Sequence, residues 1–318
     1  MVGAAGLVTV GLMADTLNIW LLSFIYSFRI HIGVVGILCG IAAIIVYRRN
    51  YVAYLIVAVG IGSTVFAWYE ARAFSPWPSF GASASTTPNM RVMSFNVLGD
   101  NRQGPRLVSI IRDIDPDVAV ILEANALLLE LPELSQTYPY RVGCGELDRG
   151  CDSLILSKYP LENRKALTLS RLSQKRLLMA DLVYKGVPIR ITSAHLTKPY
   201  YDDIQRSEIW EVIRHLNRYE GNLILTGDFN ASLMQPSIRR IPEMLDLRTG
   251  PFEPASWPIK AGRWGIAIDH ILTRPALEII ATHRIEENAG SNHYGLYADI
   301  HVPGVEAEAD DGVAAATQ

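Results

Sequence analysis

Residues 222–230 read Asn-Leu-Ile-Leu-Thr-Gly-Asp-Phe-Asn, an apolar run that ends in a short polar motif. Leu223 to Thr226 has the composition of a buried strand. Side chains two apart on a strand share a face, so Asp228 and Asn230 can point together off its end. A carboxylate beside a neutral amide offers the acceptors and donors that a phosphate diester needs. The alternative is a strand that leaves through an ordinary Asp/Asn turn.

The same arrangement recurs along the chain, where apolar strands end in polar residues capable of chemistry. These residues are Asn96, Glu123, His195, Asp228 and Asn230, together with Asp269 inside a strand and Ser291-Asn292-His293 before the last one. Because the strands must share one core, we expect their ends to meet in a cleft. The other domain histidines, His215, His270, His283 and His301, are interpreted as structural.

Hydrophobic periodicity predicts a mixture of strands and helices in the second part of the chain. Strands are expected at residues 91–96, 118–122, 153–157, 177–184, 187–193, 223–226, 266–273, 277–283 and 296–301. Helices are expected at residues 104–114, 125–134 and 201–219. Hairpins outnumber crossovers, which favours antiparallel or mixed sheets with helices packed outside them.

Apolar residues are concentrated at the start of the chain. Residues 30–47 and 51–69 each approach the roughly 20 residues that cross a bilayer as a helix. The Arg48-Arg49 loop between them is expected to be cytoplasmic, which places everything after the second span outside the cytoplasm. Residues 3–28 are a weaker candidate, either a span or an interfacial helix, because Asp15 and Asn18 interrupt them.

Composition divides the chain into four parts. Residues 1–72 are predicted to be transmembrane helices, 73–89 a linker rich in Pro, Ser, Ala and Thr, 90–303 a catalytic domain, and 304–318 a disordered acidic tail. The first part holds four of the 29 basic and two of the 32 acidic residues, which leaves 25 and 30 for the rest. The broad basic surface of a nucleic-acid-binding domain is therefore not expected.

The positions of the three cysteines are consistent with this division of the chain. Cys39 lies in a predicted span and is interpreted as an apolar packing residue. Cys144 and Cys151 bracket a short polar loop, and outside the cytoplasm such a pair can close a disulfide. No further Cys or His stands nearby at metal-ligand spacing, so a zinc site is not expected there.

Seven motifs occur in one order along residues 90–301. They are Ser94-Phe95-Asn96, Leu122-Glu123, Leu156-Ser157-Lys158-Tyr159-Pro160, Ala194-His195-Leu196, Gly227-Asp228-Phe229-Asn230, Ile268-Asp269-His270-Ile271 and Ser291-Asn292-His293. In this the chain resembles the endonuclease/exonuclease/phosphatase superfamily, which has the DNase-I-like fold. The resemblance implies an α/β (α+β) fold, a four-layer sandwich of two packed mixed β-sheets with outer helices. Here a transmembrane helical region would precede it.

The resemblance also implies a function, a divalent-metal-dependent hydrolase of phosphate esters of the phosphodiesterase, nuclease or phosphatase type. The upstream spans and Ser256-Trp257-Pro258 resemble a bacterial membrane-anchored branch. We therefore expect a multi-pass protein of the bacterial inner membrane whose catalytic domain is periplasmic or extracellular. Its partners would be the lipid bilayer and a phosphate-ester substrate; nucleic acid, phospholipid and small molecule all stay open. No protein partner can be inferred.

Residue roles follow from the same resemblance. Glu123 would be the main ligand of Mg²⁺ or Mn²⁺, helped by Asn96 and weakly by Asn292. His293, oriented by Asp269, would act on the water nucleophile, which Asp228 would position. Asn230 and His195 would bind the phosphate, and His195 could instead protonate the leaving oxygen.

One position departs from the family pattern. Ser291-Asn292-His293 stands where members usually have Ser-Asp-His, so a carboxylate is replaced by an amide. The substitution removes a charge near the expected metal. It motivates an alternative, a catalytically inactive relative that serves as a membrane-tethered binding protein. In a third interpretation the chain is a purely structural membrane protein whose polar strand ends are turns.

Overall fold

The computed structural model describes residues 23–49, 51–76 and 87–305. The expectations for residues 3–22, for the middle of the linker and for the tail from residue 306 lie outside these ranges. The boundaries of the four predicted parts stay a prediction.

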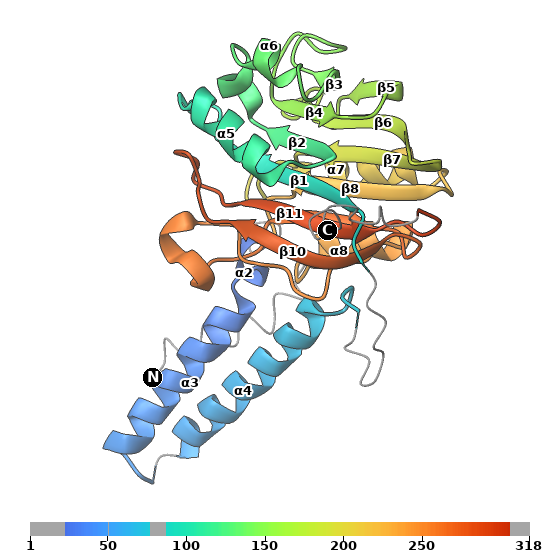
Figure 1. Ribbon diagram of the computed structural model, residues 1–318. Helices are drawn as coiled ribbons and strands as arrows, with labels where there is room; N and C mark the ends of the chain where they lie inside the picture. The colour runs from blue at the N-terminus through green and yellow to red at the C-terminus, as the bar shows by residue number, and fades with distance from the viewer. Residues whose placement is uncertain (1–22, 50, 77–86, 306–318) are drawn as a thin grey trace, which may run out of the picture.

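Two mixed β-sheets pack face to face and form the centre of the domain (Figure 1). The first has the strand order β10-β11-β1-β2-β4-β3, and the second has the order β5-β6-β7-β8-β9. The first sheet consists of β1 (Met90–Asn96), β2 (Val118–Leu122), β3 (Tyr140–Gly143), β4 (Ser153–Ser157), β10 (Glu278–Ile285) and β11 (Gly295–His301). The second consists of β5 (Glu162–Leu167), β6 (Leu177–Tyr184), β7 (Val187–Ala194), β8 (Asn222–Asp228) and β9 (Asp269–Thr273).

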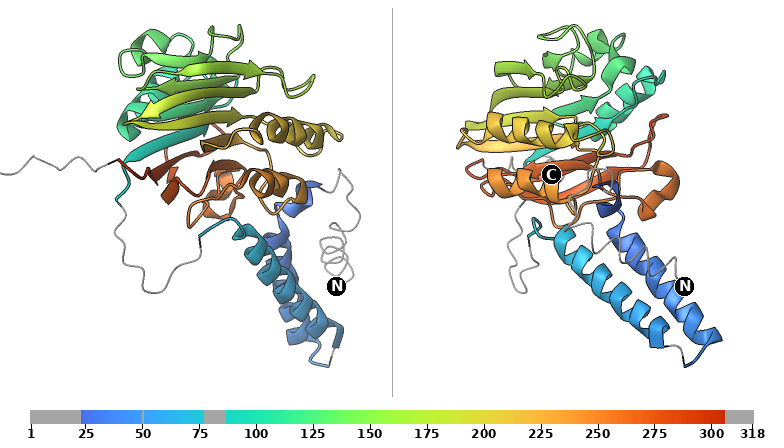
Figure 2. Two further views of the ribbon diagram at one scale, coloured as in Figure 1. Left: turned by 90° about the vertical axis from the view of Figure 1, so that its right-hand side faces the viewer. Right: turned by 180° about the vertical axis from the view of Figure 1, so that it is seen from behind.

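Helices cover the outer faces of both sheets, which makes four layers (Figure 2). α5 (Gly104–Ile114) and α6 (Leu131–Leu134) lie on the first sheet, whereas α7 (Ile204–Leu216) and α8 (Pro236–Leu245) lie on the second. Three hydrophobic clusters fill the three interfaces between layers. The central one joins residues such as Val120 and Ile155 of the first sheet to Ile191 and Ile224 of the second. The predicted fold class is thus confirmed.

The structure differs from the expected elements in a few places. The helix expected at residues 125–134 is a 3-10 helix, η2 (Ala124–Leu127), followed by the short α6. Pro132 stands at the start of α6, where its missing N–H is tolerated. Strands β3 and β5 and helix α8 were not expected. β5 carries a run of exposed charged residues, and α8 contains Pro242, so neither has a simple apolar period.

Strand register brings the polar strand ends together. β1 and β2 run parallel with Asn96 opposite Leu122, which puts Asn96 and Glu123 at one edge. β7 and β8 are also parallel, and β9 returns antiparallel with Asp269 opposite Asp228. Gly227 has φ +141°, and a Cβ there would lie 2.1 Å from the carbonyl oxygen of Ala194. A glycine is therefore required before Asp228.

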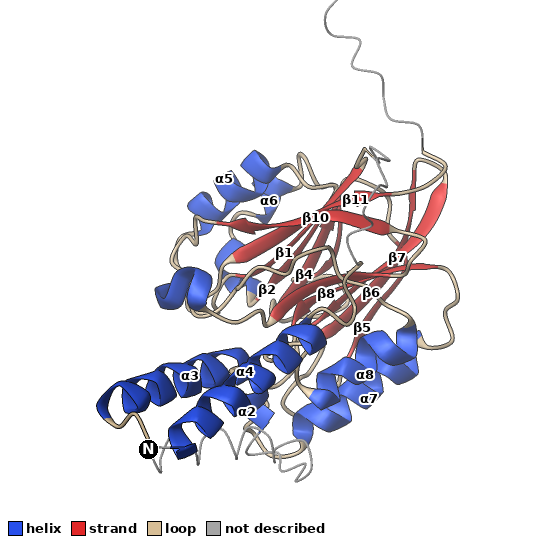
Figure 3. Ribbon diagram, turned by 90° about the horizontal axis from the view of Figure 1, so that it is seen from below, coloured by secondary structure: helices blue, strands red, loops and turns tan. Residues whose placement is uncertain are grey.

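Beneath the domain, α3 (Arg29–Val46) and α4 (Tyr51–Ala71) run side by side as a hairpin (Figures 1 and 3). Both helices are long and apolar enough to cross a membrane. The chain enters this hairpin through the short helix α2 (Ser23–Tyr26), which lies against the domain.

Buried charges join the hairpin to the domain. Glu70 of α4 accepts from Arg29 of α3 at 2.5 Å and from Arg239 of α8 at 2.7 Å. Arg29 is 2% exposed and Glu70 is 9% exposed. Just after α4, Phe74 packs into the core under α7 and α8, and its carbonyl oxygen accepts from the backbone N–H of Thr249. The hairpin is thus docked on the domain by specific contacts.

We expect Glu70→Gln to destabilise this contact by about 3 kcal/mol, because two arginines then lose a buried counter-ion. The measurement is the melting temperature of the full-length protein in detergent. Glu243→Gln is the matched control, since Glu243 also pairs with Arg239 but has a side chain 49% exposed, and exposed pairs contribute under about 1 kcal/mol. Equal melting temperatures for the two variants would contradict this role of Glu70.

Candidate active site

Asn96 connects two carboxylates from different sheets. Its Nδ2 donates to Glu123 Oε1 and to Asp228 Oδ2, each at 3.1 Å, while its Oδ1 accepts from the backbone N–H of Leu98. Asn96 and Asp228 are both 1% exposed. An amide donor at this place compensates two negative charges that would otherwise repel each other.

Glu123 is held at the strand end in an unusual conformation. Its φ of 53° lies in the left-handed region, which is costly for a residue that is not glycine. Its backbone N–H donates to the carbonyl oxygen of Asp152, and its Oε2 accepts from the backbone N–H of Gly99 at 2.6 Å. These contacts aim the carboxylate at the cleft and not along the following helix.

Asp269 and His293 form a buried pair beside Asp228. His293 Nδ1 donates to Asp269 Oδ2 at 2.8 Å, and its Nε2 lies 3.9 Å from Asp228 Oδ2. Burial alone would lower the pKa of His293, but the carboxylates of Asp269 and Asp228 outweigh it and raise the pKa to about 9. Burial and the neighbouring Asp269 raise the pKa of Asp228. Ser256 Oγ accepts from the backbone N–H of Asp269 and fixes this strand start.

Asn230 closes the turn after β8. Its backbone N–H donates to Asp228 Oδ1 at 2.7 Å, and its Nδ2 donates to the carbonyl oxygen of Leu196 at 2.8 Å. Its φ is 54°, a conformation that Asn adopts more readily than most residues. The strand ends at Asp228, and this bond from residue 230 to the side chain of residue 228 is the Asp turn that the sequence offered as the alternative. Both side chains nevertheless line the same lobe of one cleft.

His195 belongs to a second Asp–His pair, which the sequence did not reveal. Its Nδ1 donates to Asp152 Oδ2 at 3.0 Å, and Arg176 bonds the other oxygen of Asp152 at 2.7 Å. Burial would raise the pKa of Asp152, but His195 and Arg176 outweigh it and lower the pKa. The Nε2 of His195 lies 3.9 Å from Asp228 Oδ2 and 4.0 Å from Glu123 Oε1.

A disulfide between Cys144 and Cys151 closes the loop between β3 and β4. Asp152 follows Cys151 directly, so the cross-link fixes the residue that orients His195 and accepts from Glu123. The cysteine pair was interpreted only as a cross-link, yet the acid beside it was the available signal for Asp152.

These side chains line one cleft with two lobes. One lobe, of about 440 Å³, is lined by residues that include Glu123, Asp152, Arg176 and His195. The other, of about 210 Å³, contains Glu123 and His195 together with Asp228 and His293. Lys198 is exposed and lines both, which adds a positive charge. The cleft thus sets carboxylates beside cationic side chains.

Two groups of side chains could hold a divalent metal. Asp228, Asp269 and His293 present ligand atoms within 4.8 Å of one another, and Asp269 Oδ1 is buried without a hydrogen-bond partner among the described residues. Binding there would require His293 to lose its proton. Glu123 offers the two oxygens of a partly exposed carboxylate, which leaves room for the waters that Mg²⁺ retains. Asn96 turns its NH2 group to that carboxylate and its Oδ1 to Leu98, so it would have to rotate its amide to add an oxygen ligand. The donor set therefore fits a hard cation better at Glu123.

The remaining expected ligand, Asn292, is exposed on the rim of the smaller lobe. Its backbone carbonyl accepts from Ile259. Of the expected site residues, Glu123, His195, Asp228, Asn230, Asn292 and His293 line this cleft. Asn96 and Asp269 lie behind it and hydrogen-bond to residues of the lining. The individual roles stay predictions.

Comparisons with known proteins bear on the family and the fold of the chain. Residues 93–293 match the sequence model of the Endonuclease/Exonuclease/phosphatase family. None of the curated proteins matches the chain.

Solved structures share the fold at low sequence identity. A humanized TDP2 of D. rerio matches with a TM-score of 0.57 and 17% identity, over 66% of this chain and 98% of that one. An endonuclease/exonuclease/phosphatase from Beutenbergia cavernae matches with a TM-score of 0.53 and 18% identity, over 68% and 72%. A family protein from Leptotrichia buccalis matches with a TM-score of 0.51 and 16% identity, over 67% and 99%.

His270 is buried next to the cleft and contacts two loops that border it. Its Nδ1 lies 2.8 Å from Glu253 Oε1, and its Nε2 lies 3.0 Å from the carbonyl oxygen of Ala231. Burial would lower its pKa, but Glu253 and the Ala231 carbonyl outweigh it, so the pKa is raised above 6.5. The charged ring thus bonds the loop after β8 to the loop before β9.

A raised histidine pKa gives stability that is fully present below the unfolded pKa and is lost as pH rises through the folded pKa. We expect Glu253→Gln to lower the melting temperature most at pH 6.5 and below, and progressively less at higher pH. Melting curves of the full-length protein from pH 5.5 to 9, with the exposed Glu278→Gln as control, measure this. A deficit that is constant or grows with pH would contradict it.

Proposed function

The chain belongs to the Endonuclease/Exonuclease/phosphatase family, and we propose that it is a membrane-anchored, divalent-metal-dependent hydrolase of phosphate esters. Members of this superfamily typically hydrolyse phosphoester bonds. One observation carries the proposal: Asp228 stands between two Asp–His pairs, Asp152–His195 and Asp269–His293, beside the Glu123–Asn96 pair. A purely structural domain has no reason to gather four buried or half-buried carboxylates at one edge.

We propose a part for each group, supported by its position. Asp228 Oδ2 is 3.9 Å from both His195 Nε2 and His293 Nε2, so an oxygen atom placed in either gap can hydrogen-bond to the acid and to one ring. The sequence suggested that His293 acts on the water, but its raised pKa keeps the ring protonated. We therefore place the phosphate oxygens against His293 and the free side of the Asn230 amide, and the attacking water in one of the two gaps. His195 then lies next to the leaving oxygen.

The reaction is a simple displacement at phosphorus. The water oxygen bonds to phosphorus as the ester P–O bond breaks, one water proton passes to Asp228, and the leaving oxygen takes a proton from His195. Burial raises the pKa of Asp228, which makes this carboxylate a better proton acceptor. Glu123 and Asn96 would hold a Mg²⁺ or Mn²⁺ ion. When bound, this ion would neutralise negative charge on the phosphate. Positioning and charge stabilisation supply most of the acceleration.

We expect metal-stimulated hydrolysis of bis(p-nitrophenyl) phosphate by the full-length protein in detergent, and its loss in EDTA. Glu123→Gln and His293→Ala should each lower kcat at least about 100-fold. His283→Ala, which changes a half-exposed histidine of β10, is the control and should keep wild-type turnover.

Equal turnover in wild type, Glu123→Gln and His293→Ala would contradict the proposal. Absence of any hydrolysis in a correctly folded protein would favour the binding-protein alternative.

We also propose that the hairpin spans the bacterial inner membrane and that the domain lies outside the cytoplasm. Two features support this placement. The α3–α4 connection carries Arg48 and Arg49, and positive loops stay in the cytoplasm. The Cys144–Cys151 disulfide persists in oxidising compartments and is rarely kept in the cytoplasm.

Reporter fusions after Ser85 test this orientation. We expect alkaline phosphatase, which needs an oxidising compartment, to be active in this fusion, and green fluorescent protein to be dark. The reverse pattern would place the domain in the cytoplasm.

A further inference from the structure

The N-terminal segment contributes side chains to the active site itself. Phe24 of α2 and Ser27 line the same lobe as Glu123, Asp228 and His293. The ring of Phe24 meets that of Tyr200 edge-on, with centroids 6.1 Å apart. Phe24 is 39% exposed, so its outer face is open to a ligand at the mouth. Because α2 leads into α3 at Arg29, the mouth lies within a few residues of a candidate membrane span.

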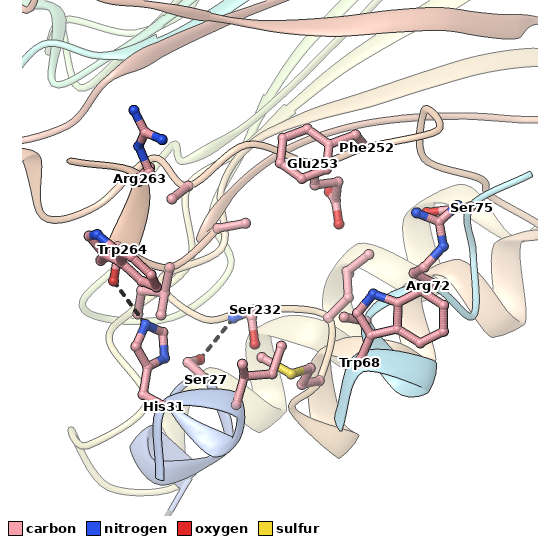
Figure 4. A pocket seen from close by; sticks show the side chains of 18 of the residues that line it. Ser27, His31, Trp68, Arg72, Ser75, Ser232, Phe252, Glu253, Arg263 and Trp264 are labelled. Atoms are coloured by element: carbon pink, nitrogen blue, oxygen red, sulfur yellow. Dashed lines mark hydrogen bonds between the residues drawn. The ribbon is translucent and has the colours of Figure 1, made fainter. Parts of the chain in front are cut away.

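An apolar cavity of about 310 Å³ adjoins this mouth and shares Ser27 and Ile266 with the catalytic lobe. Trp68 and Arg72 at the end of α4 face Phe252 and Trp264 of the domain across it (Figure 4). Ser232 N–H donates to Ser27 Oγ at 3.0 Å, and His31 Nε2 lies 2.8 Å from the carbonyl oxygen of Trp264. The cavity is therefore built between the hairpin and the domain, not within either.

Exposed aromatic side chains gather at this end of the hairpin. Besides Phe24, they are Trp68, Tyr69, Tyr200, Tyr201, Phe252 and Trp264. Tryptophan and tyrosine favour the headgroup region of a bilayer. If α3 and α4 span the membrane, the catalytic mouth and the apolar cavity both open at the level of the headgroups.

From this juxtaposition we propose that the substrate is a glycerophospholipid taken from the membrane to which the protein is anchored. Its phosphate occupies the catalytic cleft, where Lys198 adds a positive charge. Its acyl chains pass Phe24 and enter the apolar cavity or remain in the bilayer. This inference rests on the proposed hydrolysis of phosphate esters and names the substrate class of that same site.

Charge supports a lipid over an extended polynucleotide. A nucleic-acid strand adds a phosphate at every nucleotide and requires a basic track beyond the reacting group. Residues 73–318 carry 25 basic and 30 acidic residues, so this part of the chain has no excess of positive charge from which such a track could form. A phospholipid has one phosphate at the cleft and needs an apolar wall beside it.

The test compares a lipid with a water-soluble ester in the same protein. Full-length protein in detergent micelles with Mg²⁺ is given palmitoyl-oleoyl-phosphatidylglycerol, followed by ³¹P NMR, and bis(p-nitrophenyl) phosphate, followed by absorbance. We expect both to be hydrolysed and Phe24→Ala to lower the ratio of lipid to soluble kcat/KM about tenfold, because an apolar contact with the chain is lost. Phe24→Leu should restore much of that ratio.

Tyr140→Ala is the matched control, since Tyr140 on β3 is an equally exposed aromatic residue that lines neither the mouth nor the cavity. It should leave the ratio unchanged. Hydrolysis of the soluble ester without hydrolysis of the lipid would overturn the lipid substrate and leave the proposed function standing. Faster cleavage of a single-stranded oligonucleotide than of the lipid would likewise overturn the lipid substrate and leave the proposed function standing. An unchanged ratio in Phe24→Ala would overturn the role of α2, and hydrolysis of neither ester would overturn both proposals.

Discussion

The side-chain amide of Asn96 spans the seam between the two sheets, where it donates to Glu123 from the first sheet and to Asp228 from the second. This contact depends on the register of two parallel strand pairs, which puts the ends of β1, β2, β7 and β8 at one edge. It also depends on Gly227, which lets β8 pass close to the end of β7. Strand pairing and close packing at this edge thus place one carboxylate on each side of the Asn96 amide.

Two further constraints orient the groups that face Asp228. The disulfide fixes the loop that ends at Asp152, and Asp152 with Arg176 fixes the ring of His195. On the other side, Ser256 fixes the start of β9, and Asp269 fixes the ring of His293. Each ring is held through Nδ1, which leaves Nε2 directed at Asp228. Such orientation through a carboxylate partner keeps imidazole groups in one tautomer.

Much of this arrangement could be predicted from the sequence. Apolar strands that end in Asn96, Glu123, His195 and Asp228 indicated a shared edge, and the ordered motifs indicated the fold. Asp152 was not assigned, because it follows the disulfide-closed loop and does not end a strand; its only sequence signal was its place next to Cys151. Likewise, Phe24 and Tyr200 are in contact but lie 176 positions apart in the sequence, so no local sequence pattern predicts this contact. Strand β5 was missed because its side chains are mostly solvated and lack alternation.

In the proposed site, Glu123 and Asn96 form the metal side, and the Asp269–His293 pair forms the other side of the phosphate. Mn²⁺ binding to the full-length protein, followed by electron paramagnetic resonance, tests this arrangement most directly. We expect one bound Mn²⁺ that is lost in Glu123→Gln and retained in Asp269→Asn. Retention in Glu123→Gln with release in Asp269→Asn would contradict this arrangement and place the ion at Asp228, Asp269 and His293.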